Sequence, residues 1–348
     1  MILLLCASLA SAAPQIDLYS MGPGDELFSR FGHSAVCVQN DAKTRCYNYG
    51  STSIEPRRLI VGFVRATAAF EVTRNSLDHM LEKYAEQDRR VWRQHLPLSD
   101  EQATELAERL ARDARPENKY YMYDHFVDNC TTRIRDHIDA VTGGALSRKT
   151  KDLLWDRTLR DAVREGLSAD LPVAAGIEMV TGSYIDHVPT VWEAMFLPDV
   201  LRSQVERSLG AIPVEIASPT HERPSPWPLI GPALLAGGGV AWALLARAAG
   251  RWGRAASTIV ASVVGVILWV VTLSAVAPSF RANLAAAFFW PTDLLLLWPR
   301  VGRGYAIARA GVLVAIVALS LIGVVKQSLI GPAVLGAGLL VGALPRRR

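Results

Sequence analysis

The last third of the chain is apolar, and after residue 226 it contains a single acidic residue, Asp293. Lipid offers no hydrogen-bond partners to a polypeptide backbone, so apolar stretches that cross a bilayer must form helices or a closed barrel. Four stretches here are long or nearly long enough to cross as helices: residues 228–246, 259–276, 308–325 and 329–344. The sequence therefore predicts an all-α transmembrane domain of four to five helices over residues 227–348.

Arginines at the ends of these stretches predict an orientation. The first stretch is followed by Arg247, Arg251 and Arg254, and the chain ends in three arginines at 346–348. The positive-inside rule places both groups in the cytoplasm and the residues before the first stretch on the opposite side. Because four crossings would leave the terminal arginines on the wrong side, an odd number of crossings is required.

Residues 283–298 are the candidate for a fifth crossing. The segment is short and contains Pro291 and Asp293. An acidic group at membrane depth is costly, so a re-entrant or interfacial segment is the alternative.

The remainder of the chain reads as a soluble domain with a leader. Residues 15–217 have a mixed, charged composition, and a proline-rich polar linker at 218–226 separates them from the apolar part. Residues 1–13 are apolar and end in the small-residue string ASAA, which is typical of a secretory signal peptide or its remnant, although the basic leading region is missing. A buried N-terminal strand is the alternative.

Composition argues against several classes of function. The net charge is only +4, and basic residues are interspersed with acidic ones, so the basic stripe of a nucleic-acid-binding protein is missing. The seven histidines are scattered, and neither a CxxC nor an HExxH spacing occurs. We therefore expect no metal, no cofactor and no nucleic-acid partner.

Cys130 is the candidate nucleophile. Apolar residues recur at helical spacing from Ile134 to Val141, which predicts a helix with Cys130 on its first turn, capped by Asn129 or Asp128. Free backbone amides and the helix dipole favour a thiolate at that position. A buried packing role is the alternative, but the polar neighbours in DNCTT argue against a core position.

A β-hairpin is predicted around His33. Residues 33–39 and 44–49 alternate, and the string NDAK between them is typical of a turn. With a two-residue loop, Cys37 lies opposite Cys46, and Asn48 becomes a diagonal neighbour of His33 on the same face. His33 is thus the candidate general base, and Asn48 is the candidate orienting group for its far nitrogen. An Asn48 amide bonded only to backbone is the alternative.

The two hairpin cysteines are close enough for a disulfide in an oxidising compartment. Directly opposed strand cysteines often make strained bridges, so two small buried hydrophobic residues are the slightly favoured alternative. Further elements are expected from periodicity and capping signals: a strand at 59–72, a helix at 76–87, a strand at 91–98 and a helix at 99–112 that begins with a capping box at Ser99 and Gln102.

Several strings together resemble a known family. FGHSAV, CYNYGS, FVRATAAFEV, LPLSDEQ, RPENKYYMYDHFVDNCTTRIRDHID and PTVWEAMFLPD occur in this order within roughly residues 15–205. In order and spacing they resemble the Lnb N-terminal periplasmic domain family, which is similar to the permuted papain-like (NlpC-type) superfamily. The resemblance implies an α+β soluble domain with His33 as base and Cys130 as nucleophile, in a multi-pass protein of the bacterial inner membrane whose N-terminal domain is periplasmic.

The resemblance also implies an activity. Characterised relatives move an acyl chain from a phospholipid donor to the α-amine of diacylglyceryl lipoproteins, through a cysteine thioester. Two alternatives stay open: a cysteine peptidase or amidase acting on cell-wall peptides, and a non-catalytic scaffold in which Cys130 is buried and unreactive.

Overall fold

The computed structural model describes residues 13–40, 43–223, 226–298 and 300–344. Its chain clusters into two compact units. The first comprises residues up to 54, 69–154 and 190–222, and the second comprises 55–68, 155–189 and the residues from 223 onward. Two segments of the predicted 15–217 domain, 55–68 and 155–189, thus belong to the second unit, and the predicted domain boundaries stay a prediction. The predicted leader, except for its last residue, and the terminal arginines lie outside the described residues.

An antiparallel sheet forms the centre of the first unit, with the strand order β6-β4-β3-β2-β1-β5-β7. The strands are β1 (Gln15–Met21), β2 (His33–Asn40), β3 (Lys43–Ser51), β4 (Ala69–Ser76), β5 (Val91–His95), β6 (Tyr120–Met122) and β7 (Val214–Ala217). Strands and helices are therefore mixed in this unit, as the sequence predicts; the finer papain-like assignment is not decided by this topology.

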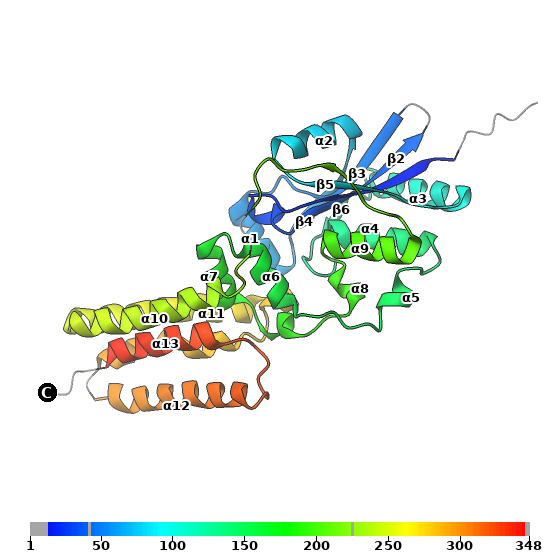
Figure 1. Cartoon of the computed structure of the whole chain (residues 1–348). Coiled ribbons are helices and arrows are strands. Elements are labelled where there is room, and N and C mark those ends of the chain that lie inside the picture. The colour runs from blue at the N-terminus through cyan, green and yellow to red at the C-terminus, as the bar shows by residue number, and fades with distance from the viewer. Residues whose placement is uncertain (1–12, 41–42, 224–225, 299, 345–348) are drawn as a thin grey trace, which may run out of the picture. The chain divides into compact units, whose positions relative to one another are not determined.

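Helices cover both faces of the sheet (Figure 1). On one face, α2 (Leu77–Glu86) packs on β3 and β4; on the other, α4 (Cys130–Val141) packs on β2 and β3 while α3 (Asp100–Asp113) and α9 (Pro198–Leu209) pack on β1. Shorter helices complete the unit: η1 (Leu27–Ser29), α5 (Ser147–Thr150) and α8 (Val191–Ala194). Buried Tyr19, Met80 and Tyr84 form a core between the sheet and α2. The candidate site lies beside this core.

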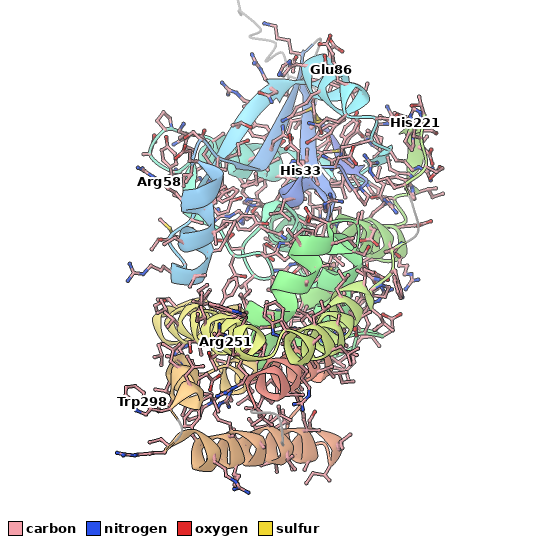
Figure 2. The ribbon with its side chains drawn as sticks, turned by 90° about the vertical axis from the view of Figure 1, so that its left-hand side faces the viewer. His33, Arg58, Glu86, His221, Arg251 and Trp298 are labelled. Atoms are coloured by element: carbon pink, nitrogen blue, oxygen red, sulfur yellow. A yellow bond between two sulfur atoms is a disulfide. The ribbon has the colours of Figure 1, made fainter. Side chains whose placement is uncertain are left out.

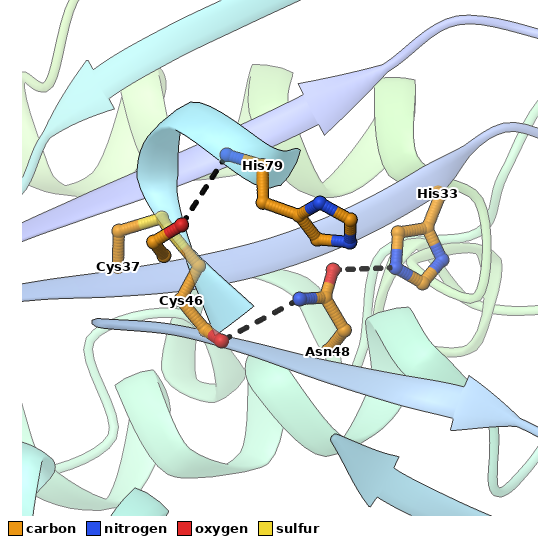
Figure 3. The surroundings of a disulfide bond; sticks show 6 residues. His33, Cys37, Cys46, Asn48 and His79 are labelled. Atoms are coloured by element: carbon orange, nitrogen blue, oxygen red, sulfur yellow. Dashed lines mark hydrogen bonds between the residues drawn. A yellow bond between two sulfur atoms is a disulfide. The ribbon is translucent and has the colours of Figure 1, made fainter. Parts of the chain in front are cut away.

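The hairpin prediction is confirmed in detail. Strands β2 and β3 pair with Ala35 opposite Asn48 and Cys37 opposite Cys46. The favoured reading of the two cysteines as unlinked residues is wrong, because the structure joins them in a disulfide across strands whose Cα atoms are 3.9 Å apart (Figure 3). The loop residues 41–42 lie outside the described part of the chain.

The helices at 76–87 and 99–112 are confirmed as α2 and α3, and the capping box of α3 is formed by Ser99 and Gln102. The strand predicted at 59–72 is wrong in its first half, where α1 (Pro56–Arg65) forms with proline in its first turn and ends at Ala66 in a left-handed conformation. An apolar run of this length cannot be assigned to strand or helix by periodicity alone. Strand β4 begins only at Ala69.

The second unit is helical. Three of its helices are long and apolar enough to cross a membrane, namely α10 (Ile230–Ala248), α11 (Arg251–Ser274) and α12 (Gly302–Leu321). The predicted crossing at 329–344 is the shorter helix α13 (Ile330–Ala343). It packs on α10 through glycines, since a Cβ atom on Gly338 would lie 2.1 Å from the carbonyl oxygen of Gly239. Shorter elements of this unit are α6 (Leu159–Leu167), α7 (Leu171–Val180), η2 (Ser183–Asp186) and η3 (Pro278–Phe280).

Residues 283–298 do not form the continuous helix that a fifth crossing would need. They fold into two 3-10 segments, η4 (Leu284–Phe288) and η5 (Pro291–Leu297). Asp293 is buried there, and Arg309 of α12 donates to it with an Nε–Oδ1 distance of 2.8 Å. Arg309 also donates to the carbonyl oxygen of Phe288. The cation thus offsets the cost of the buried carboxylate that argued for a re-entrant segment.

Reduction of the Cys37–Cys46 disulfide is expected to lower the free energy of unfolding of the first unit by about 2 kcal/mol, because a closed short loop constrains the unfolded chain. Chemical unfolding of the full chain in detergent, with and without reductant, measures the change. The Cys37→Ala/Cys46→Ala variant serves as the control and should show no further shift on reduction. An unfolding midpoint of the parent chain that does not respond to reductant would contradict the structural role of the bond.

Candidate active site

The position of Cys130 is set by Asn129, the residue before α4. The Oδ1 atom of Asn129 accepts from the amides of Thr131 and Thr132 at 2.8 and 2.9 Å, and Thr132 Oγ1 accepts from the Asn129 amide in return. The side-chain nitrogen of Asn129 donates to the carbonyl oxygens of His125 and Phe196. This buried asparagine therefore joins three segments of chain and fixes Cys130 as the first residue of the helix, as predicted.

The start of α4 is also tied to the start of β2. Thr131 Oγ1 lies 3.3 Å from Ser34 Oγ, and both side chains are fully buried. Cys130 Sγ lies 3.7 Å from Thr131 Oγ1. Because Ser34 follows His33 directly, these contacts hold the sulfur and the imidazole at neighbouring ends of two elements.

His33 is at the sheet of the first unit (Figure 2), and Asn48 lies on the same face, as the hairpin register predicts (Figure 3). His33 Nε2 is 3.3 Å from Asn48 Oδ1, while Asn48 Nδ2 donates to the carbonyl oxygen of Cys46 at 3.5 Å. The second contact orients the amide so that its oxygen faces the imidazole. An amide oxygen only accepts, so the favoured tautomer of His33 carries its proton on Nε2 and leaves Nδ1 free to accept the proton of a thiol.

Two glycines line the pocket that contains the thiol and the imidazole. Gly32 and Gly50 have positive φ angles of 84° and 92°, which favour glycine. A Cβ atom on Gly50 would lie 3.7 Å from Cys130 Cβ. His33 and Cys130 both line a cavity of about 60 Å³ beside these glycines, together with Phe196 and His125. The structure therefore brings together the thiol, the imidazole and the amide named from the sequence; their catalytic roles stay predictions.

The resting pair is neutral. Burial raises the pKa of the Cys130 thiol, although the backbone amides of Ser34 and Cys130 oppose the effect. Burial and the charge of Arg89 lower the pKa of His33 to about 3, while the Asn48 hydrogen bond acts in the opposite direction. The expectation that the helix start favours a thiolate is therefore wrong for the free protein, because desolvation outweighs the amides.

Sequence reasoning missed several residues around the pair. The ring centroid of Tyr84 lies 6.1 Å from that of His33, and the guanidinium of Arg89 lies 4.8 Å from the Tyr84 ring. His125 is half-buried among aromatic rings that include Phe31 and Phe196. The string PTVWEAMFLPD carried a signal for Phe196, but the contacts of His33 with Tyr84 and of His125 with Phe31 join residues distant in sequence and have no local pattern.

Replacement of Asn129 by alanine is expected to lower the free energy of unfolding by about 2–4 kcal/mol, because it removes a helix cap and leaves buried backbone groups without partners. Ser99→Ala is the matched control: it removes a solvent-exposed helix cap and should cost about 1 kcal/mol. Urea unfolding of the full chain in detergent compares the two. Equal and small losses of unfolding free energy in the two variants would show that the Asn129 contacts do not hold the site.

The neutral pair predicts the pH dependence of Cys130 alkylation. Its rate with iodoacetamide should rise steadily with pH and reach half its maximum above the ordinary pKa of a thiol, since only the thiolate reacts. An imidazolium–thiolate pair would instead give a plateau from roughly pH 4 to pH 7. The rate of modification of the Cys130 peptide, followed by mass spectrometry, separates the two, and a plateau would contradict the neutral pair.

The comparisons with known proteins give one match. No curated protein and no solved structure matches the chain. The sequence pattern of the Lnb N-terminal periplasmic domain matches residues 7–163, a range that contains His33, Asn48 and Cys130. This match and the three apolar helices indicate a membrane protein with a periplasmic N-terminal domain. The resemblance seen in the sequence is thereby confirmed over residues 7–163, which match the Lnb N-terminal periplasmic domain family.

Proposed function

We propose that this protein is a cysteine-dependent acyltransferase of the bacterial inner membrane, which moves an acyl chain from a phospholipid to the α-amine of a diacylglyceryl lipoprotein. The observation that carries the proposal is the pocket shared by Cys130 and His33, with the far nitrogen of the imidazole on Asn48. Histidine precedes cysteine in the chain, which is the order of a permuted papain-like domain. The same chain contains helices apolar enough to cross a membrane.

The first half-reaction forms a thioester. Nδ1 of His33 takes the proton of the Cys130 thiol as Sγ attacks the ester carbonyl of the phospholipid. The amides of Ser34 and Cys130, which lie against the sulfur, donate to the oxyanion that develops. The C–O bond then breaks, and the imidazolium returns its proton to the leaving oxygen, so that a lysophospholipid departs and the acyl group stays on Cys130.

The second half-reaction transfers the acyl group to an amine. The free α-amine of the lipoprotein attacks the thioester carbonyl, and His33 takes the amine proton. The C–S bond breaks, and the proton passes to the sulfur, which regenerates the neutral pair. Burial lowers the pKa of His33 to about 3, so the imidazole of the free protein is neutral at physiological pH, which is the protonation state that a base requires.

The membrane helices support transfer between lipid-anchored substrates. Donor and acceptor are both confined to the bilayer, so attachment of the thiol domain to the same bilayer raises their effective concentration at the site. A multi-pass membrane domain with a periplasmic N-terminal domain fits this arrangement, since mature lipoprotein amines are exposed on the periplasmic side.

A periplasmic cysteine peptidase or amidase is the second candidate. A larger cavity beside His33 is lined mainly by polar side chains, among them Thr73, Asn75 and Gln87, as a peptide substrate would require. In that case water would replace the lipoprotein amine as acceptor, and a cell-wall peptide would replace the phospholipid.

Expression of the chain in a bacterium that lacks lipoprotein N-acylation tests the first candidate. Mass spectra of lipoprotein N-terminal peptides should gain one acyl chain, and Cys130→Ala and His33→Ala should each abolish this gain. Asn48→Ala should lower the rate about 10- to 100-fold, because the base loses its orienting group.

His95→Ala is the matched control, since His95 is a largely exposed histidine on β5 that should not affect the reaction. Folding of each variant is checked by its unfolding midpoint. Activity that survives either Cys130→Ala or His33→Ala would dismiss the pair. Cleaved cell-wall peptides without any acylated lipoprotein would favour the peptidase.

A further inference from the structure

The larger cavity beside the candidate pair lies entirely within the first unit and has a volume of about 370 Å³. His33 lines both this cavity and the small pocket that contains Cys130, as do Gly32, Gly50 and Phe70. The cavity therefore continues from the thiol pocket past the imidazole. We call it the headgroup cleft.

Two cationic side chains face the headgroup cleft. Lys83 is exposed in the last turn of α2, whereas Arg89 is only 3 % exposed. Arg89 is held in place because its Nε donates to the carbonyl oxygen of Gly22 at 2.8 Å and its Nη1 donates to Gln87 Oε1 at 3.3 Å. Both charges lower the pKa of His33, so their field reaches the imidazole.

Most of the remaining lining side chains can accept or donate hydrogen bonds, while Phe70, Met80 and the ring of Tyr84 add apolar surface. The polar lining includes Ser51, Thr52, Thr73, Asn75 and Gln87, with one carboxylate, Glu26. Two cations against one anion make the cleft positive. The two cations suit an anionic group better than an uncharged acyl chain.

The direction of the proposed reaction fixes where such a group must lie. His33 returns its proton to the oxygen that leaves the ester carbonyl, so this oxygen has to approach the imidazole. In a phospholipid that oxygen belongs to glycerol, which carries the phosphodiester only a few bonds away. The phosphodiester must therefore lie close to His33, and the headgroup cleft, which His33 lines and Cys130 does not, is a cationic space at that position.

We propose that the headgroup cleft binds the phosphodiester of the acyl donor, with Lys83 and Arg89 as its cationic partners. This assignment rests on the proposed acyl transfer and adds the part of the donor that the protein recognises. It makes Lys83 a specificity-determining residue: the site prefers donors that carry a phosphodiester over neutral glycerides with the same acyl chains.

A comparison of two donors in detergent micelles tests the assignment. Phosphatidylglycerol and diacylglycerol present the same esters with and without the phosphodiester. With the full chain, the rate of acylation of Cys130 is measured with each donor, and the ratio of the two rates is compared between variants. Lys83→Gln should lower this ratio about tenfold through loss of a charge-assisted contact, and Lys83→Arg should largely keep it.

Lys43→Gln is the matched control, because Lys43 is an exposed lysine of the same unit that does not line the cleft. Its ratio should equal that of the parent chain. Lys83 is chosen over the buried Arg89 because an exposed residue can be changed without unfolding the domain.

The outcomes separate the possible failures. Acylation of Cys130 with an unchanged ratio in Lys83→Gln overturns the headgroup assignment and leaves the acyl transfer standing. No acylation from either donor overturns both the headgroup assignment and the acyl transfer.

Inhibition by inorganic phosphate is a further measurement. Inhibition of the phosphatidylglycerol reaction that weakens in Lys83→Gln supports the cleft as a phosphodiester site. Phosphate binding that depends on Lys83 while the donor ratio stays unchanged identifies a site for free phosphate instead and overturns the assignment.

Discussion

The hydrogen bonds of Asn129 hold the first turn of α4 to the loop before it and to the segment around Phe196, and the candidate site depends on them. Both the oxygen and the nitrogen of the buried Asn129 side chain take part in these bonds. The helix start, the loop before it and the segment around Phe196 therefore cannot move independently. The cavity shared by the thiol and the imidazole is only about 60 Å³. A small displacement of the helix start would separate Cys130 from His33, because the two residues belong to different elements that no covalent cross-link joins.

The neutral state of the pair follows from burial and has a chemical use. A thiol that stays protonated is a poor target for oxidation and for exchange with other disulfides, which matters for a domain in an oxidising compartment. The same domain has the Cys37–Cys46 disulfide on the neighbouring strands. In the proposed mechanism, proton transfer follows the arrival of a substrate carbonyl, whose oxyanion the amides of Ser34 and Cys130 stabilise. The proposal thereby couples reactivity to the presence of substrate.

Local patterns in the sequence were sufficient for the parts of the site that lie on single elements. The hairpin register around His33, the helix at Cys130 and the capping role of Asn129 all follow from alternation, turn length and capping signals. Long-range packing was not accessible in the same way: Arg89 reaches the carbonyl of Gly22 only after the sheet has formed. The helix α1 was missed because the short apolar run at residues 59–64 suits either state. The sign of the Cys130 pKa shift was missed because it depends on burial, which no local pattern reports.

The most direct test of the account is the mass of the Cys130 peptide after the full chain is incubated with phospholipid in the absence of an amine acceptor. We expect this peptide to gain one acyl chain that hydroxylamine removes, as a thioester requires, while an equal amount of lysophospholipid appears. A Cys130 peptide of unchanged mass, from folded protein whose thiol still reacts with iodoacetamide, would contradict the central claim that this cysteine carries an acyl group.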